Sequence, residues 1–307
     1  MSSFENTYIS IIILLFLGYL LKKSKLLKSD DVKPLNVILI NILMPCMIFM
    51  ALYTEDISIF SKLYLMPFIP ILPALFVGLF TLLILKFYNF SKIKILSLML
   101  AVVLGNTAYL GYSIVSGIFG GDGLIRAIFF DLSTPILFSC LSIILIINIE
   151  GDLKDVLKKV LGFPILWSFS FGIIMNILNI PIGDVLENTI NDIGATAIPL
   201  AMFSLGLSLD FSRMKNNIKI VSFISSIKLI MYPLLSFIIV MLLNLKGLEF
   251  KVGIVESAMP SSILSLILAS AYGLEWELVA DCVFMSTILS FISLPIITFA
   301  LNNHYFI

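Results

Sequence analysis

Histidine, cysteine and charged residues are scarce in this chain of 307 residues. The single histidine, His304, excludes a histidine-based metal site. Cys46, Cys140 and Cys282 stand alone inside apolar stretches, without the spacing of a metal site or a disulfide framework. Lysine and arginine number 19, as do aspartate and glutamate, so the zero net charge gives no sign of a nucleic-acid partner. We expect neither a metal nor another cofactor.

Apolar residues make up most of the sequence. The chain is 60% hydrophobic and 12% charged, whereas a soluble domain is about 25% charged. Its mean hydropathy of +1.12 extends over the whole length, and no soluble fold of this size can bury so much apolar surface. The short alternating strands of a membrane β-barrel are absent from the sequence. The composition therefore predicts a multi-pass, all-α protein of the cytoplasmic membrane.

Ten apolar stretches are long enough to be candidate membrane spans, and the linkers between them are short and polar. No soluble domain is inserted, so residues 1–307 are expected to form a single membrane domain. The predicted spans are 7–21, 35–53, 64–86, 93–119, 124–149, 163–180, 188–208, 218–243, 250–272 and 276–301.

The basic residues between these spans predict the orientation. Alternate linkers hold fourteen basic residues in one set and four in the other, and the richer set belongs in the cytoplasm. Both termini are then expected outside. The cytoplasmic set is Lys22, Lys23, Lys25, Lys28, Lys33, Lys86, Lys92, Lys94, Lys154, Lys158, Lys159, Arg213, Lys215 and Lys219, and the outer set is Lys62, Arg126, Lys246 and Lys251.

The two halves of the chain share a pattern of residues at an offset of 154. Gly18, Pro45 and Phe49 correspond to Gly172, Pro199 and Phe203. Repeat 1 covers about 1–150 and repeat 2 about 151–307, each with five predicted spans. Because five is odd, the second repeat must enter the membrane from the opposite side, which is the inverted arrangement typical of secondary carriers.

The fourth and ninth spans carry signals for helix breaks near their centres. In the fourth, Gly105 and Gly111 flank the polar pair Asn106–Thr107, and in the ninth Pro260 precedes Ser261. Glycine and proline are poor helix formers, and half-helices that end at such a point direct backbone groups at a bound ion. Pro45 and Pro199 are further predicted break points. Simple kinks, with the polar residues joining neighbouring helices, are the alternative.

Several motifs together resemble the auxin efflux carrier family, which includes plant PIN-type carriers and bacterial dicarboxylate permeases. They include Leu17–Lys23, Leu43-Met44-Pro45, Asn106–Gly111, Ala258-Met259-Pro260 and Ser286–Ser290, so the resemblance runs almost end to end. It implies ten helices in two repeats, crossing broken helices 4 and 9, and an elevator-like motion. The short linker between the fifth and sixth spans fits a prokaryotic member.

The resemblance also implies roles for residues at the two breaks. Asn106 matches the family's crossover asparagine, expected to touch a substrate carboxylate, and Pro260 matches the proline of the second crossover. One position departs from the family's pattern, because Ser113 stands where the first crossover usually has a proline. The break in the fourth span must then depend on Gly105 and Gly111.

Ionisable residues inside the spans are candidates for a transport pathway, because charge is costly there. Lys228 lies about 15 Å deep in the eighth span, and could neutralise a substrate or take the place of a coupling cation. Glu256, one helical turn before Pro260, is a candidate proton carrier or a partner for Lys228. Asp131 and Asp281 are candidate ion-coupling acids or interfacial charge partners. Asn41 could line the site from the second span.

These features predict a secondary transporter, not an enzyme, that moves a small organic anion such as a mono- or dicarboxylate by alternating access. Asn106, Thr107, Lys228, Pro260, Ser261 and Asn41 are the predicted substrate-binding residues. Either H⁺ or Na⁺ could be the coupling ion, and a sodium symporter of the bile-acid-symporter type is the alternative. An intramembrane hydrolase and a channel fit the sequence less well. The lipid bilayer is the expected surrounding, and the sequence leaves open whether the protein forms a homodimer.

Overall fold

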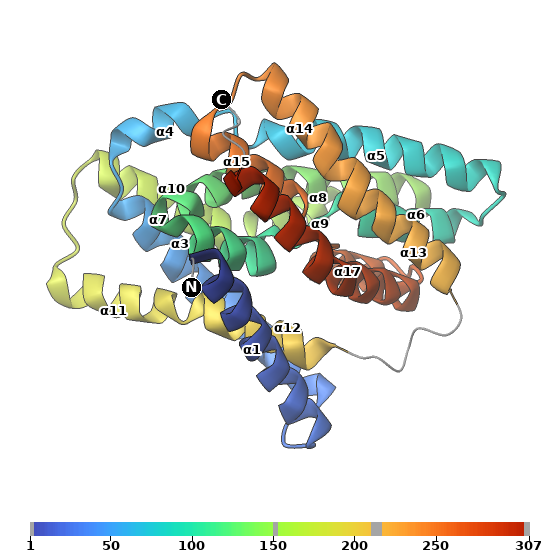
Figure 1. Ribbon diagram of the computed structural model, residues 1–307, viewed down its shortest axis with the longest axis horizontal. Coiled ribbons are helices and arrows are strands. Elements are labelled where there is room, and N and C mark those ends of the chain that lie inside the picture. Colours follow the sequence, from blue (N-terminus) through green and yellow to red (C-terminus); the bar gives the residue numbers. More distant parts are fainter. Residues whose placement is uncertain (1–2, 150–152, 210–216, 304–307) are drawn as a thin grey trace. The chain divides into compact units, whose positions relative to one another are not determined.

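The computed structural model describes residues 3–149, 153–209 and 217–303, and over these it is helical, apart from turns and one isolated bridge (Figure 1). Of the residues discussed above, Arg213, Lys215 and His304 lie outside the described residues. The prediction of an all-α protein is confirmed.

The chain divides into two compact units, and each unit takes residues from both predicted repeats. Unit 1 comprises Met1–Tyr64, Ala108–Phe129 and Leu161–Leu209. Unit 2 comprises Leu65–Thr107, Phe130–Val160 and Asp210–Ile307.

Unit 1 is built on two closely packed groups of helices. Helix α1 lies along α12, and α3 lies against both α10 and α11 (Figure 1). Aromatic rings join further parts of this unit, because Phe129 packs against both Phe60 and Phe169. The elements are α1 (Ser3–Lys23), η1 (Ser29–Asp31), α2 (Val32–Ile38), η2 (Leu39–Leu43), α3 (Met44–Tyr53), α4 (Ile57–Leu63), α10 (Pro164–Ile177), α11 (Asp184–Ala195) and α12 (Ala197–Ser208).

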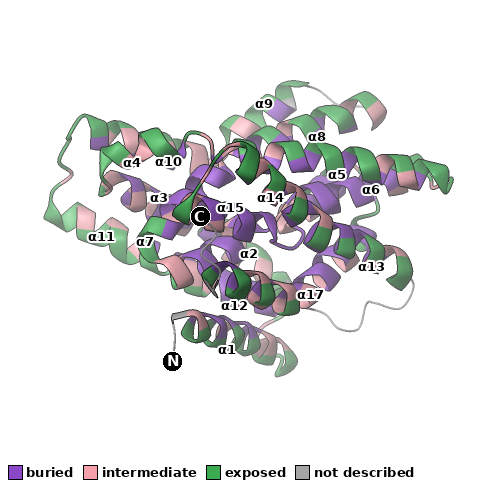
Figure 2. Cartoon of the chain, turned by 45° about the horizontal axis from the view of Figure 1, so that its top comes forward, coloured by how far each residue is buried: buried purple, intermediate pink, exposed green. Residues whose placement is uncertain are grey.

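Unit 2 surrounds the short helix α15, whose residues from Val252 to Ser257 are all buried (Figure 2). Its elements are α5 (Phe68–Phe87), α6 (Lys92–Val103), α8 (Ser133–Ile149), α13 (Ile218–Ser226), η4 (Ile227–Met231), α14 (Tyr232–Leu242), α15 (Gly247–Ser257), α16 (Ile263–Ala271) and α17 (Trp276–Asn303). Three elements have residues in both units: η3 (Thr107–Gly111), α7 (Tyr112–Asp131) and α9 (Leu153–Leu161).

Seven helical stretches of the described chain are long and apolar enough to cross a membrane. The predicted spans 93–119 and 250–272 are not continuous, because each is divided into shorter helices. The count of ten spans and the inverted relation of the repeats stay predictions. The seven stretches are Phe4–Lys23, Val32–Tyr53, Ile57–Phe87, Thr107–Asn148, Asp184–Ser208, Ile218–Leu242 and Trp276–Asn302, and Pro164–Ile177 is apolar but shorter.

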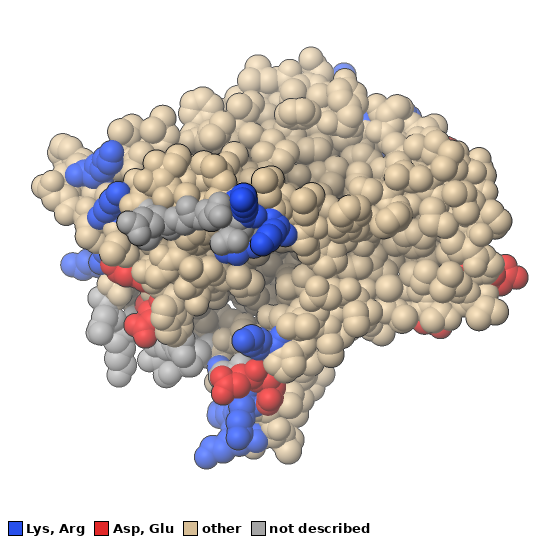
Figure 3. Space-filling model, turned by 180° about the vertical axis from the view of Figure 1, so that it is seen from behind, with Lys and Arg blue, Asp and Glu red and all other residues tan. Residues whose placement is uncertain are grey.

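Large apolar side chains are exposed along several of these helices. On α5, for example, Leu75, Phe76, Leu79 and Leu83 are each more than half exposed. The face shown in Figure 3 is largely free of charged residues, which gather at a few places. Apolar surface of this extent does not occur on soluble monomers, and a bilayer is the solvent that suits it.

Two of the predicted break residues lie inside continuous helix. Pro45 follows the π-helical segment η2, and the helix runs on from Val32 to Tyr53. A π turn accommodates a proline because it shifts the hydrogen-bond register that the missing N–H would otherwise interrupt. Gly111 ends the π-helical segment η3 and leads directly into α7. In contrast, the helix around Pro199 is interrupted at Thr196, between α11 and α12.

The contact between α1 and α12 depends on two glycines. A Cβ on Gly206 would overlap the backbone carbonyl of Leu15, and one on Gly18 would overlap the carbonyl of Phe203. Small residues allow helix backbones to approach this closely, which is the usual basis of tight helix pairs in membranes.

We expect Gly206→Ala to destabilise the protein by about 1–3 kcal/mol, because the added methyl group must push α1 away from α12. Gly121→Ala is the matched control, since its Cβ would meet no atom within 4 Å. Thermal unfolding of the purified variants in detergent measures the difference. Equal midpoints for the two variants would show that the helix pair can separate at no cost.

Candidate functional site

Helices α6 and α15 both end inside unit 2, at the two breaks predicted from the sequence. Helix α6 ends at Val103, and Leu104 is already extended, with φ −83° and ψ 125°. Helix α15 ends at Ser257, and α16 begins after Ser262, whose hydroxyl caps it by accepting a hydrogen bond from Leu264 N at 3.1 Å. Gly105 and Pro260 lie between these ends, and neither favours a helix interior.

The two non-helical segments cross as a short antiparallel bridge between Gly105 and Ser261. Asn106 N donates to Pro260 O at 2.7 Å, and Ser262 N donates to Leu104 O at 3.0 Å. A third backbone donor, Ser261 N, bonds to the hydroxyl of Ser286 on α17 at 3.0 Å. The broken helices therefore satisfy each other's backbone, which the interior of a membrane protein requires.

Two polar side chains at this crossing are buried without a partner. Asn106 is 2% exposed and Ser261 is fully buried. Neither the side-chain amide nitrogen of Asn106 nor the hydroxyl of Ser261 has a hydrogen-bond partner among the described residues. Unsatisfied buried polar groups are rare in proteins, so they mark a place where a ligand or water completes the bonding.

Thr107 connects the crossing to a buried acid. Its hydroxyl donates to Asp131 Oδ1 at 2.5 Å, and the hydroxyl of Thr134 donates to the same oxygen at 2.6 Å. The carboxylate of Asp131 is thus held beside the first residue of η3. Asp131 is buried, and its expected role as an ion-coupling acid or an interfacial charge partner stays a prediction.

Lys228 lies in the π-helical segment η4, which directly precedes Tyr232 and Pro233. Its ammonium lies 3.4 Å from Val103 O, at the end of α6, and 3.8 Å from the centroid of the Tyr232 ring. Tyr232 is fixed in turn, because its hydroxyl donates to Pro70 O at 2.8 Å. Within the described chain no carboxylate forms an ion pair with Lys228, although the side chain is only 1% exposed.

Glu256 lies in the same cluster, on the last turn of α15. It is 1% exposed, and neither carboxylate oxygen has a hydrogen-bond partner in the part of the chain that the structure describes. It interacts electrostatically with Asp131 and lines one cavity together with Lys228 and Thr107. That cavity has a volume of about 10 Å³, which is room for roughly one water molecule. Lys228 and Glu256 form no ion pair, so the interpretation of Glu256 as a partner for Lys228 finds no support among the described residues.

Asn41 and Asp281 are the remaining predicted residues. Asn41 belongs to unit 1, where its side chain is exposed and donates to Val37 O within its own helix. Asp281 lies on α17 in unit 2, half-buried, and is not among the residues that line the cavity. The structure therefore brings together Asn106, Thr107, Pro260 and Ser261 at the crossing. Next to them it places Lys228, Glu256 and Asp131.

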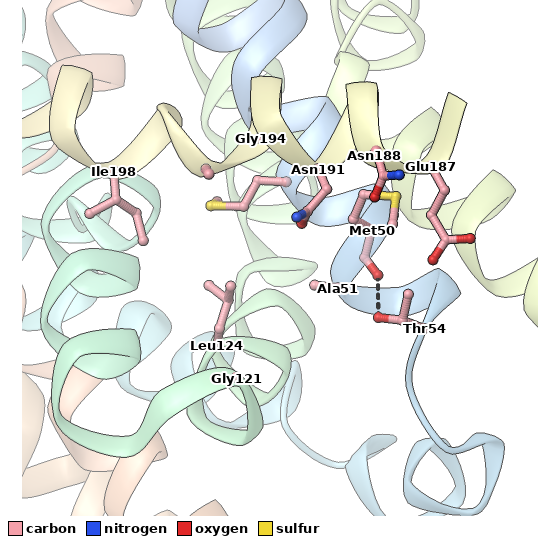
Figure 4. Close-up of a pocket in the computed structure, with 12 residues that line it drawn as sticks. Met50, Ala51, Thr54, Gly121, Leu124, Glu187, Asn188, Asn191, Gly194 and Ile198 are labelled. Atoms are coloured by element: carbon pink, nitrogen blue, oxygen red, sulfur yellow. Dashed lines mark hydrogen bonds between the residues drawn. The ribbon is translucent and has the colours of Figure 1, made fainter. Parts of the chain in front are cut away.

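A larger cavity, of about 430 Å³, lies in unit 1 between α3, α7 and α11 (Figure 4). Its polar side chains include Glu187, Asn188 and Asn191 of α11, and Thr54, whose hydroxyl bonds to Met50 O. It has an acid and no basic residue in its lining, which does not suit an organic anion. The crossing in unit 2 is therefore the better candidate.

The supporting roles of Ser286, Thr134 and Tyr232 were not predicted from the sequence, although Ser286 lies in one of the motifs named above. Each touches the cluster only through the tertiary fold, because Ser286 and Thr134 are ordinary helix residues in sequence. Tyr232 gives a weak signal, since it follows Lys228 by four residues and shares its helix face.

Comparison with known proteins gives consistent matches over nearly the whole chain. The family described as "Membrane transport protein" matches residues 5–154 and 152–298. An uncharacterized transporter of Methanothermobacter thermautotrophicus is 35% identical over 291 residues, covering 95% of this chain and 96% of its own. An uncharacterized transporter of Methanocaldococcus jannaschii is 33% identical over 302 residues, covering 95% and 97%.

Proposed function

Since the chain belongs to the membrane transport protein family, we propose that it is a secondary transporter of a small organic anion that works by alternating access. The observation that carries this proposal is the crossing of two broken helices with unpartnered, buried donors on it. Broken helices that meet in this way are the usual substrate sites of secondary carriers. Family membership also favours transport over the hydrolase and channel alternatives.

The substrate carboxylate is expected to bind at Asn106, with Thr107 and Ser261 beside it. A carboxylate that leaves water needs donors and positive charge in return. The amide of Asn106 supplies a free donor, and the ends of η3 and α16 that face the crossing add the positive poles of their helix dipoles. Lys228 supplies positive charge within the same unit. The small cavity means that the substrate binds in a more open conformation.

Proton coupling fits the cluster better than sodium coupling. Neither oxygen of Glu256 has a hydrogen-bond partner among the described residues, so protonation is a simple way to neutralise the side chain when the site is closed. The oxygens of Thr107, Thr134 and Asp131 favour the sodium alternative, because such groups coordinate hard cations. Against it, the ammonium of Lys228 already lines the same cavity.

Asn106→Ala should weaken anion binding by about ten- to a hundredfold, because a hydrogen bond to a charged group contributes roughly 1.5–3 kcal/mol. The variant should fold as well as the parent, since it removes a buried group that has no partner among the described residues. Asn148→Ala, which removes a half-buried amide on α8, is the control. A panel of mono- and dicarboxylates is first screened by thermal stabilisation, and binding isotherms then compare the variants. A panel without any stabilising anion, or equal affinities, would contradict this site.

Glu256→Gln should abolish uptake driven by a pH gradient while it preserves exchange of labelled for unlabelled substrate. The amide cannot release a proton but keeps the shape of the side chain. Glu275→Gln, an exposed acid in the same unit, should transport normally. Proteoliposome flux with and without a gradient measures both modes. Normal gradient-driven uptake by Glu256→Gln would assign coupling to another group.

We also propose that both termini face outward, on the strength of the bias in basic residues. Single cysteines at Ser61 and Ser91, both exposed, test this in a background without Cys46, Cys140 and Cys282. An impermeant thiol reagent should label position 61 from outside and leave position 91 unlabelled. The reverse pattern would invert the topology.

A further inference from the structure

The ammonium of Lys228 lies where an unpaired helix end attracts a cation. Val103 is the last residue of α6, and the final carbonyls of a helix carry the negative pole of its dipole. The 3.4 Å distance from Lys228 Nζ to Val103 O places the charge at this pole. Gly105 lies beside the ammonium as well, since a Cβ there would be in van der Waals contact with the same nitrogen, at 3.4 Å.

The other surroundings of the ammonium are also those of a cation site. The Tyr232 ring presents its face to the charge at 3.8 Å, and its hydrogen bond to Pro70 O fixes it there. Glu256, with both carboxylate oxygens unbonded within the described chain, lines the adjoining cavity. The carbonyl oxygen and the aromatic face both favour a positive charge at this point, as does the carboxyl group of Glu256 when it is ionised.

The space around Lys228 argues against two other roles. A structural salt bridge would show an acid paired with the ammonium, and the described residues contain none. In this conformation the cavity beside the ammonium has room for about one water molecule, so no carboxylate reaches the ammonium while the site is closed. The lysine enters from the π-helical segment η4, a type of irregularity that is frequent at functional sites.

We propose that Lys228 fills, with its own ammonium, a monovalent-cation site at the end of the broken helix α6. Secondary carriers with broken helices commonly bind a sodium ion at such half-helix ends. In this chain the cation is covalently attached, so the site needs no metal ion from solution. The consequence for ion coupling rests on the proposed function. With the ammonium in the cation site, transport is independent of sodium, and the proton is left as the coupling ion.

Removing the ammonium should uncover the site. In Lys228→Ala the carbonyl of Val103 and the carboxylate of Glu256 remain, and the space left by the side chain can hold a small cation. Thermal midpoints of the purified protein are measured without any substrate, in sodium chloride and in N-methyl-D-glucamine chloride at equal ionic strength. For Lys228→Ala the midpoint should be higher in sodium by about 3 °C or more, as expected for a ligand well above its dissociation constant.

Two controls make this result specific to sodium at this site. The parent protein and Lys219→Ala, an exposed lysine on α13, should give the same midpoint in both salts. Lys228→Gln, which is neutral but fills part of the space, should show a smaller sodium effect than Lys228→Ala. It also serves as the test variant if the alanine variant does not fold.

Two outcomes would overturn the proposal. One is stabilisation of the parent protein by sodium, because its site would then not be filled. The other is the absence of a sodium-specific effect in both Lys228 variants, including a failure of both to fold in either salt. Since the assay contains no organic anion, its result is independent of whether the chain transports one.

Discussion

The hydrogen bonds between the two non-helical segments in unit 2 are the constraint on which the site depends. A helix that ends in the middle of an apolar domain leaves backbone groups without water to bond to. Asn106 N and Ser262 N find carbonyl partners on the opposite segment, and Ser261 N finds the hydroxyl of Ser286. The pairing is reciprocal, so neither break is stable without the other.

The positions of the charged side chains in the cluster follow from the two helix breaks. The end of α6 presents a negative pole that Lys228 compensates, and the turn that follows holds Thr107 against Asp131. The positive and negative groups are buried near one another, yet the described residues show no ion pair between Lys228 and an acid. A fully paired cluster would be inert, whereas unbonded groups such as Glu256 can respond to a proton, a substrate or a movement of the helices.

Regular helix is modified at several other places by proline and by π turns. Each of the π-helical segments η2 and η4 is followed by a proline two residues after its last residue. The proline is Pro45 after η2 and Pro233 after η4. A π turn inserts one extra residue, which rotates the helix face that follows it. In η4 this irregularity contains Lys228, so the distortion and the buried charge occur together.

The sequence by itself determined the class of the protein and the position of both breaks. Glycine and proline are poor helix formers, and each break contains one of them beside polar residues, so local chemistry indicated where the breaks lie. It also identified Asn106 and Lys228, because polar groups inside apolar stretches are visible without coordinates. The sequence also predicted a break at Gly111. That residue instead ends the π-helical segment η3, because the chain is helical again after the break at Gly105.

Only the tertiary structure decided which of these groups meet. Glu256 and Lys228 are an acid and a base that both lie inside predicted spans, so an ion pair between them was one expectation. The fold instead turns the ammonium toward Val103 O and the Tyr232 ring, and leaves the carboxylate unbonded among the described residues. The side chain of Asn41 bonds within its own helix in unit 1, so its expected role at the site stays a prediction. Such choices depend on side-chain directions and contacts between distant segments, which residue spacing along a helix does not specify.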